Sequence, residues 1–289
     1  MLSTTVTILL FGVAYGMILY LTSVGLSVTM GLMGFVNLAH GVFAMLGGYV
    51  MVTLMNAAGM PFLLALAIAC VAVTALGFVL ERLLYSLLYG SSELDQVLFS
   101  IGLVLISVAL ARMVWGPLAQ PIQLPAYLQG QISLAGVSIP TYRMFLVLFG
   151  GLVVAGLWFG FERTMFGAIV RAAVDNRAMA QAIGIDTNRL FAMTFGVGTG
   201  LAALGGGLGA EILAIAPAYP LQYIVFFLIV VAVGGLGSIK GPFYAAIIIG
   251  LTETIGKYIF PQAGMLIVYV SVFLLLLWRP QGLVGKRRE

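Results

Sequence analysis

The sequence predicts an all-α protein, a polytopic bundle of about eight or nine transmembrane helices, and three observations support this fold class. Apolar residues make up 62% of the chain and charged residues 8%, against about 45–50% and 25% in soluble domains. The mean hydropathy is +1.17. Residues 1–80 contain no Asp, Glu, Lys or Arg, and a span needs roughly 20 apolar residues. Residues 1–289 are therefore expected to form a single transmembrane domain, with no segment left over for a soluble catalytic domain.

Glycine, asparagine, proline and charged residues divide the chain into nine expected spans. Residues 116–141 contain four prolines and are expected to be a loop, because proline removes a helix hydrogen-bond donor. Residues 221–256 are too long for one span and are broken by glycines before Lys240, so two spans are expected there. Eight spans remain the alternative if 31–56 is re-entrant or one glycine-broken piece does not cross. The nine spans are 6–30, 36–56, 61–80, 96–115, 143–161, 191–213, 221–236, 243–257 and 263–278.

The distribution of basic residues predicts the orientation, since cytoplasmic loops carry an excess of Lys and Arg. With nine alternating spans, ten basic residues fall on one side and three on the other. The first side is therefore expected to be cytoplasmic and to hold the C-terminus. It carries Arg82, Arg163, Arg171, Arg177, Arg189, Lys240, Arg279, Lys286, Arg287 and Arg288, while the other side carries Arg112, Arg143 and Lys257.

The cytoplasmic loop at about 162–190 is the one strongly polar region. Its alanine-rich run 171–183 favours a helix, Gly184 is a plausible C-terminal cap, and Asp186 followed by Thr187 is a plausible N-cap for the next helix. Ile169, Ala173, Ala180 and Ile183 form a small apolar stripe beside the charges. This pattern suits a short helix that docks on a cytosolic partner, and it also suits a solvated loop whose arginines only set the orientation.

A second candidate site lies in the membrane at Asn37, His40 and Gly41. On a helix Asn37 and His40 would share a face, at spacing i, i+3. Polar side chains at bilayer depth face the bundle interior or a cavity, so these two either pack against a neighbouring span or line a pathway. No metal site is expected, because His40 is the only histidine and lacks partner ligands.

The sequence lacks the signature of a nucleotide-hydrolysing site. No Gly-x-x-x-x-Gly-Lys-Ser/Thr motif occurs, and residues 237–242 resemble one only superficially. We therefore expect neither an enzyme nor a bound cofactor. Glu253 and Lys257, at spacing i, i+4, are expected to form an interfacial ion pair, and Glu211 is ambiguous. The glycine clusters predict close helix packing.

Several motifs resemble the LivH-type permeases of branched-chain amino-acid ABC importers. Residues 37–41, Asn-Leu-Ala-His-Gly, followed by Gly47-Gly48-Tyr49, resemble the Asn-Phe-Ala-His-Gly segment of that family, from which Leu38 departs. The run from Arg171 to Phe191 resembles the family's loop against its ATPase. Residues 235–242 and residues 278–283 also resemble segments of that family, so the resemblance extends over nearly the whole chain.

The resemblance implies a permease with a type II importer-like fold in the bacterial inner membrane. It further implies a second related permease, two cytosolic ATPases and a periplasmic substrate-binding protein, with no nucleic acid partner. Relatives carry branched-chain amino acids, urea, short amides or aromatic acids, which leaves the substrate open. An ion-coupled secondary transporter of a small solute is the alternative. The residues expected to couple to the ATPase are Arg171, Asp175, Arg177, Gly184, Ile185, Asp186, Arg189, Ser238 and Lys240.

Overall fold

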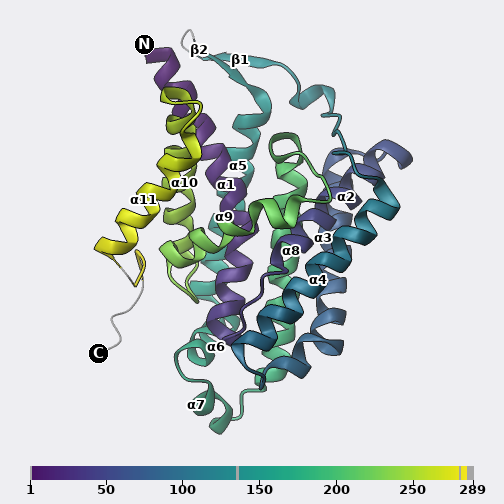
Figure 1. Ribbon diagram of the computed structural model, residues 1–289, viewed down its shortest axis with the longest axis vertical. Helices are drawn as coiled ribbons and strands as arrows, with labels where there is room; N and C mark the ends of the chain where they lie inside the picture. Colours follow the sequence, from purple (N-terminus) through teal and green to yellow (C-terminus); the bar gives the residue numbers. More distant parts are fainter. Residues whose placement is uncertain (1, 135–136, 280, 285–289) are drawn as a thin grey trace.

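A computed structural model describes residues 2–134, 137–279 and 281–284 and shows a helical bundle with one small hairpin (Figure 1). Each of the nine expected spans coincides with a helix. These helices are α1 (Leu2–Met33), α2 (His40–Ala58), α3 (Phe62–Leu83), α4 (Glu93–Trp115), α5 (Thr141–Arg163), α8 (Thr187–Leu213), α9 (Tyr219–Gly234), α10 (Lys240–Ile259) and α11 (Gly264–Trp278). The connecting elements are η1 (Tyr85–Leu88), η2 (Ala126–Leu128), β1 (Gln131–Leu134), β2 (Val137–Pro140), α6 (Met165–Asp175) and α7 (Arg177–Ala182).

In the described part of the chain, six helices are long and apolar enough to cross a membrane. They are α1, α2, α3, α4, α5 and α8. Helix α9 and the apolar part of α11, Leu266–Trp278, are shorter, and α10 carries three charged residues within its 20 residues. The prediction of a multi-span helical membrane protein is confirmed, whereas a count of eight or nine spans stays a prediction.

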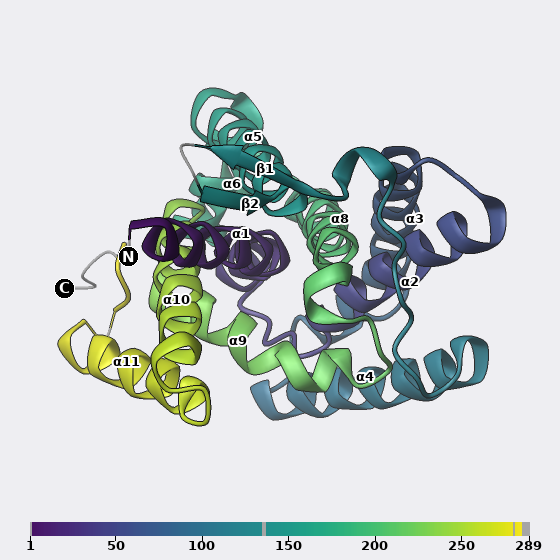
Figure 2. The ribbon, with the colours of Figure 1, turned by 90° about the horizontal axis from the view of Figure 1, so that it is seen from above.

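Helices α1 and α8 form the centre of the bundle, as the view from above shows (Figure 2). Helix α1 packs against α5, α8, α9 and α10, and α8 packs against α1, α2 and α3. Both central helices are largely buried, while α3, α4 and α5 expose most of their apolar surface. Those outer surfaces suit contact with lipid or with another membrane subunit.

Three consecutive glycines of α8, residues 205–207, explain how three helices meet α8 at one level. A Cβ atom added at the first would lie 2.5 Å from the Thr22 side chain of α1. At the second it would lie 1.9 Å from the Ala44 carbonyl oxygen of α2, and at the third 2.8 Å from the Leu66 side chain of α3. No side chain fits in this space, so the expected role of glycine in close packing is confirmed here.

The proline-rich segment contains a two-stranded antiparallel hairpin, which the all-α prediction lacked. Strands β1 and β2 pair with Ile132 opposite Ile139. Along β2, buried Val137 and Ile139 alternate with exposed Ser138, the pattern of a half-buried strand. Pro140 stands at the end of the strand, where a missing donor does not break the pairing.

The prediction that Asn37 and His40 share one helical face was wrong. Helix α2 begins at His40, and residues 34–37 have no regular structure. The Asn37 side-chain oxygen accepts a hydrogen bond from the Ala39 amide at 3.1 Å. This local turn gives the backbone an alternative to the helix, which is a known preference of asparagine.

The expected helix over 171–183 is divided into two. Helix α6 ends at Asp175, and α7 starts after Asn176, whose side-chain oxygen accepts a hydrogen bond from the Met179 amide at 3.0 Å. Asparagine is among the strongest N-cap residues, so this one residue starts a new helix in a different direction. The sequence analysis expected two helical segments separated by a break before residue 187, and the structure has three, namely α6, α7 and α8.

Candidate functional site

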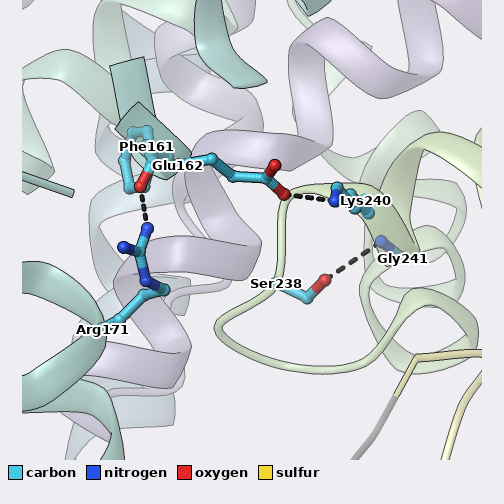
Figure 3. A network of polar contacts seen from close by, with 6 residues as sticks. All are labelled: Phe161, Glu162, Arg171, Ser238, Lys240 and Gly241. Carbon is cyan, nitrogen blue, oxygen red and sulfur yellow. Dashed lines mark hydrogen bonds and ion pairs between the residues drawn. The ribbon is translucent and has the colours of Figure 1, made fainter. Parts of the chain in front are cut away.

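The elements at the α6–α7 end of the molecule form a surface that we call the coupling face. It comprises the last turn of α5, helices α6 and α7, the first turn of α8 and the 237–242 turn before α10 (Figure 1). Helix α6 folds back closely on α5, since a Cβ at Gly167 would lie 2.0 Å from the Phe161 carbonyl oxygen. The Arg171 guanidinium donates a hydrogen bond to that same oxygen (Figure 3). Arg171 thus ties α6 to α5.

The turn before α10 meets the end of α5 at this face. Lys240 forms an ion pair with Glu162, and each side chain is nearly half exposed (Figure 3). The Ser238 hydroxyl accepts a hydrogen bond from the Gly241 amide at 3.0 Å and so caps the start of α10. The structure therefore brings Ser238 and Lys240 next to the predicted coupling loop, although they lie far from it in the sequence.

The same turn is fastened to the central helix α1. The Gly237 amide donates to the Ser27 carbonyl oxygen at 2.9 Å, and the Ser27 hydroxyl donates to the Ser238 carbonyl oxygen at 3.0 Å. A Cβ at Gly31 would lie 2.3 Å from the Gly237 Cα, and a Cβ at Gly237 would lie 2.8 Å from the Val174 side chain of α6. Helix α6, the turn and α1 are therefore in direct contact.

Helix α7 is joined to α8 and α3 by a chain of side chains. The Arg177 guanidinium lies 4.6 Å from the centre of the Phe191 ring, in cation–π geometry. Phe191 packs edge-to-face against Tyr89 at 5.3 Å, and the Tyr89 hydroxyl donates a hydrogen bond to Glu81 at the end of α3. Arg177 therefore positions α7 against the first turn of α8.

The two caps predicted around residue 185 are confirmed. Gly184 has a φ of +91°, the left-handed region that favours glycine, and Ile185 follows it partly buried. The Asp186 carboxylate accepts a hydrogen bond from the Arg189 amide at 3.1 Å and forms an ion pair with the Arg189 side chain at 2.9 Å. Asp175 is the last residue of α6. Contact between these residues and an ATPase stays a prediction.

The sequence analysis included Ile183 in its apolar stripe but missed two further apolar side chains that the coupling face exposes, Met165 and Met179. Met179 and Ile183 on and after α7 are 60% and 70% exposed, and Met165 at the start of α6 is 77% exposed. Ile183 was expected to share a stripe with Ala173 and Ala180, and only the two alanines are buried. The i, i+4 spacing of Met179 and Ile183 in a polar segment was the available signal. Exposed apolar groups among charges are typical of a docking surface.

His40 and Asn37 are buried, and each has a protein partner. The His40 ring nitrogen Nε2 lies 3.0 Å from the Thr22 carbonyl oxygen of α1, and the Tyr85 hydroxyl donates to the Asn37 side-chain oxygen at 3.1 Å. Gly41 lies against the start of α9, where a Cβ would come 3.1 Å from the Pro220 Cα. The structure thus shows packing contacts for all three residues, and their role in a pathway is not tested by it.

The irregular segment before α2 is held in place by α4. The Val36 amide donates to the Gln96 side-chain oxygen at 3.2 Å, and the Ser100 hydroxyl donates to the Val36 carbonyl oxygen at 3.2 Å. Non-helical backbone within a membrane is tolerated where protein or a water-filled cavity surrounds it. The segment that precedes His40 is therefore an ordered, non-helical part of the bundle interior, stabilised by hydrogen bonds to α4.

Charged side chains also pair at the opposite end of the bundle. Lys257 forms the predicted ion pair with Glu253, with a nitrogen–oxygen distance of 2.5 Å. Arg143 lies 3.9 Å from Glu211. Within the ranges that the structure describes, no group of three or more His, Cys, Asp or Glu side chains could hold a metal ion.

Comparison with known proteins decides the family. The model of the family described as "Branched-chain amino acid transport system / permease component" matches residues 8–277. The chain belongs to this family. The similar proteins include the permease BraD of Pseudomonas aeruginosa, 28% identical over 95% of this chain and 94% of the relative, and the permease LivH of Escherichia coli, 26% identical over the same shares. A probable permease LivH of Methanocaldococcus jannaschii is 26% identical over 94% of this chain and 90% of the relative. No solved structure gives a significant match.

Family membership settles the choice between the two classes of transporter. The permease is the membrane component of an ATP-binding-cassette importer, and the ion-coupled alternative is not supported. It is a multi-pass, non-enzymatic subunit, and ATP hydrolysis belongs to partner subunits. ATPase and substrate-binding partners in general follow from the family.

Proposed function

We propose that the permease carries a branched-chain amino acid or a related small solute across the inner membrane by alternating access. In this proposal two permeases, two ATPases and one periplasmic binding protein form the importer, and the permease has eight or nine spans in a type II importer-like arrangement. The observation that carries the proposal is the coupling face, where exposed α7 is linked through α6 and the 237–242 turn to central α1.

The gathering of basic residues supports a cytoplasmic position for the coupling face. Arg171, Arg177, Arg189 and Lys240 all lie there, with Arg82 near the end of α3. The Leu283 amide donates to the Val233 carbonyl oxygen at 2.7 Å, which supports a C-terminus on the same side. Lys286, Arg287 and Arg288, which entered the sequence argument, lie outside the described residues.

The contacts at the coupling face suggest how ATP binding acts on the bundle. Closure of the ATPases would displace α6 and α7. Two residues of α6 would pass this movement on: Arg171 is hydrogen-bonded to α5, and Val174 packs against Gly237. Because Gly237 is hydrogen-bonded to Ser27, the displacement would reach α1. The result is a two-state equilibrium that is shifted by a ligand bound to a partner chain.

The composition of the purified complex tests the proposal. Mild-detergent purification of the tagged permease is expected to recover an ATPase and a second permease, and the complex in liposomes is expected to accumulate L-leucine only with ATP and a loaded binding protein. Accumulation by the permease alone, driven by a proton or sodium gradient, would contradict it.

Substituting leucine for Asn37 and for His40 is expected to lower uptake while the complex stays assembled. The His40 contact with the Thr22 carbonyl and the Asn37 contact with Tyr85 hold the irregular segment that the proposal places beside the pathway. Loss of one buried hydrogen bond costs about 1–3 kcal/mol. Initial uptake rates and gel filtration check this, and wild-type uptake in both variants would remove these residues from the pathway.

Charge reversal across the Glu162–Lys240 pair is expected to weaken coupling, and exchange of the two charges is expected to restore it. Glu162→Lys and Lys240→Glu each place like charges together at the contact between α5 and the 237–242 turn. We expect each single variant to hydrolyse several times more ATP per solute transported, and the double variant to return towards the wild-type ratio. If the double variant is as poorly coupled as the singles, the pair itself has no role.

A further inference from the structure

The buried carboxylate of Glu253 lies in the outer half of the bundle, where ion-pair formation does not fully account for it. Its residue exposure is 3%, whereas the Lys257 side chain that pairs with it is 56% exposed. The second carboxylate oxygen, Oε2, is buried and has no hydrogen-bond partner among the described residues. A buried carboxylate with an unused oxygen is costly inside a membrane and marks a functional position.

The surroundings of Glu253 match the chemistry that recognises a cation. The Tyr15 hydroxyl of α1 is a hydrogen-bond donor to this carboxylate, and Tyr223 of α9 lies near it. The Tyr219 and Tyr223 rings lie 4.7 Å apart, and the Tyr219 hydroxyl is buried without a partner in the described structure. Carboxylate oxygens together with aromatic rings favour an ammonium group over a neutral amide.

The site adjoins the residues predicted to line the pathway. Glu253 lies one turn after Gly250, on the face of α10 that meets α1, where a Cβ at Gly250 would come 2.5 Å from the Gly12 carbonyl oxygen. Tyr219 begins α9 directly beside Pro220, against which Gly41 packs. The carboxylate therefore stands between α1, α9 and α10, on the side of the bundle where α9 begins.

We propose that Glu253, with Tyr15, Tyr219 and Tyr223, binds the ammonium group of the transported solute, and that the Lys257 ammonium occupies this place when no solute is bound. Lys257 is long, flexible and mostly exposed, so it can leave without disturbing the fold. The inference rests on the proposed function and narrows the substrate class to amino acids, since urea and neutral amides carry no ammonium group.

Uptake of L-leucine by the complete importer in liposomes tests this assignment. Glu253→Gln is expected to lower leucine uptake at least tenfold, and Glu253→Asp to give an intermediate loss. Lys257→Gln is expected to preserve uptake or to lower the KM for leucine severalfold, because it removes the competing ammonium. Glu211→Gln, which neutralises the other carboxylate paired at this end of the bundle, serves as the matched control and is expected to stay within twofold of the unmodified importer.

The opposite effects expected at Glu253 and Lys257 separate a binding site from a structural ion pair. If Lys257→Gln loses uptake as fully as Glu253→Gln, the pair is structural and the inference is wrong. Uptake by Glu253→Gln within twofold of the unmodified importer also overturns it. Thermal melting in detergent identifies a variant that does not fold, in which case the Glu253→Asp and Lys257→Gln results decide. An unmodified importer without ATP-driven leucine uptake would instead overturn the proposed function.

Discussion

Leucine in place of Gly206 is expected to leave almost no folded permease in the membrane. A Cβ at this position would lie 1.9 Å from the Ala44 carbonyl oxygen, which belongs to the α2 backbone and cannot rotate away. Helices α2 and α8 would have to separate, and the contacts of α8 with α1 and α3 at the same level would be lost with them. Overpacking of a close-packed core costs about 1–3 kcal/mol, occasionally more. Yield after mild-detergent extraction and the melting temperature measure the loss.

Gly102 of α4 provides the matched control for Gly206. It also lies within an apolar helix, but no atom beyond the nearby backbone of its own helix lies within 4 Å of a Cβ added there. Gly102→Leu is therefore expected to fold with a melting temperature close to that of the unmodified protein. Gly206→Ala, which adds the Cβ alone, should already melt several degrees lower. Equal stability of the Gly206 and Gly102 variants would show that α2 and α8 are not in the contact described.

Local sequence patterns were sufficient to predict most helices and caps. Apolar runs bounded by proline, glycine or charge gave all nine main helices, since the bilayer requires long apolar segments. Gly184 and Asp186 were recognised as caps because the backbone at helix ends has few alternatives. The Glu253–Lys257 pair followed from helical spacing alone.

Predictions failed where one side chain competes with the helix for backbone hydrogen bonds. The side-chain oxygens of Asn37 and Asn176 both accept a hydrogen bond from an amide two or three residues ahead; Asn37 forms a local turn before α2, and Asn176 starts α7. Helix propensity summed over a window does not contain this effect. Strands β1 and β2 were missed for a different reason, because each has only four residues and both lie in a proline-rich segment.

Contacts between distant segments could not be predicted from the sequence. The Glu162–Lys240 ion pair and the hydrogen bond from Gly237 to Ser27 leave no periodic pattern in the sequence. Each depends on how α1, α5 and α10 are arranged in space. The sequence assigned Ser238 and Lys240 to the coupling site only through a resemblance. The structure supplies the physical link by placing that turn between α6 and the central helix.

Aspartate at both Met179 and Ile183 is expected to abolish association with the ATPase. Both side chains are exposed at the coupling face, on α7 and directly after it, while Ala180 of the same helix is buried. An apolar side chain that fills a partner's groove contributes about 1.5–3 kcal/mol on burial, and a carboxylate there adds a desolvation cost. Two such changes together should lower affinity by two or more orders of magnitude. Co-purification of the ATPase with the tagged permease, and ATP-driven uptake, measure the loss.

Tyr127→Asp is the control for a polar change at an exposed side chain. Tyr127 is 61% exposed and lies in η2, beside the hairpin at the opposite end of the molecule from α7. It is expected to leave the amount of co-purified ATPase unchanged. Normal extraction and melting of the Met179→Asp/Ile183→Asp variant would show that the bundle is intact, because neither residue contributes to the core. An importer that retains its ATPase and its uptake in this variant would place the docking contact elsewhere on the coupling face, on Arg189 and the first turn of α8.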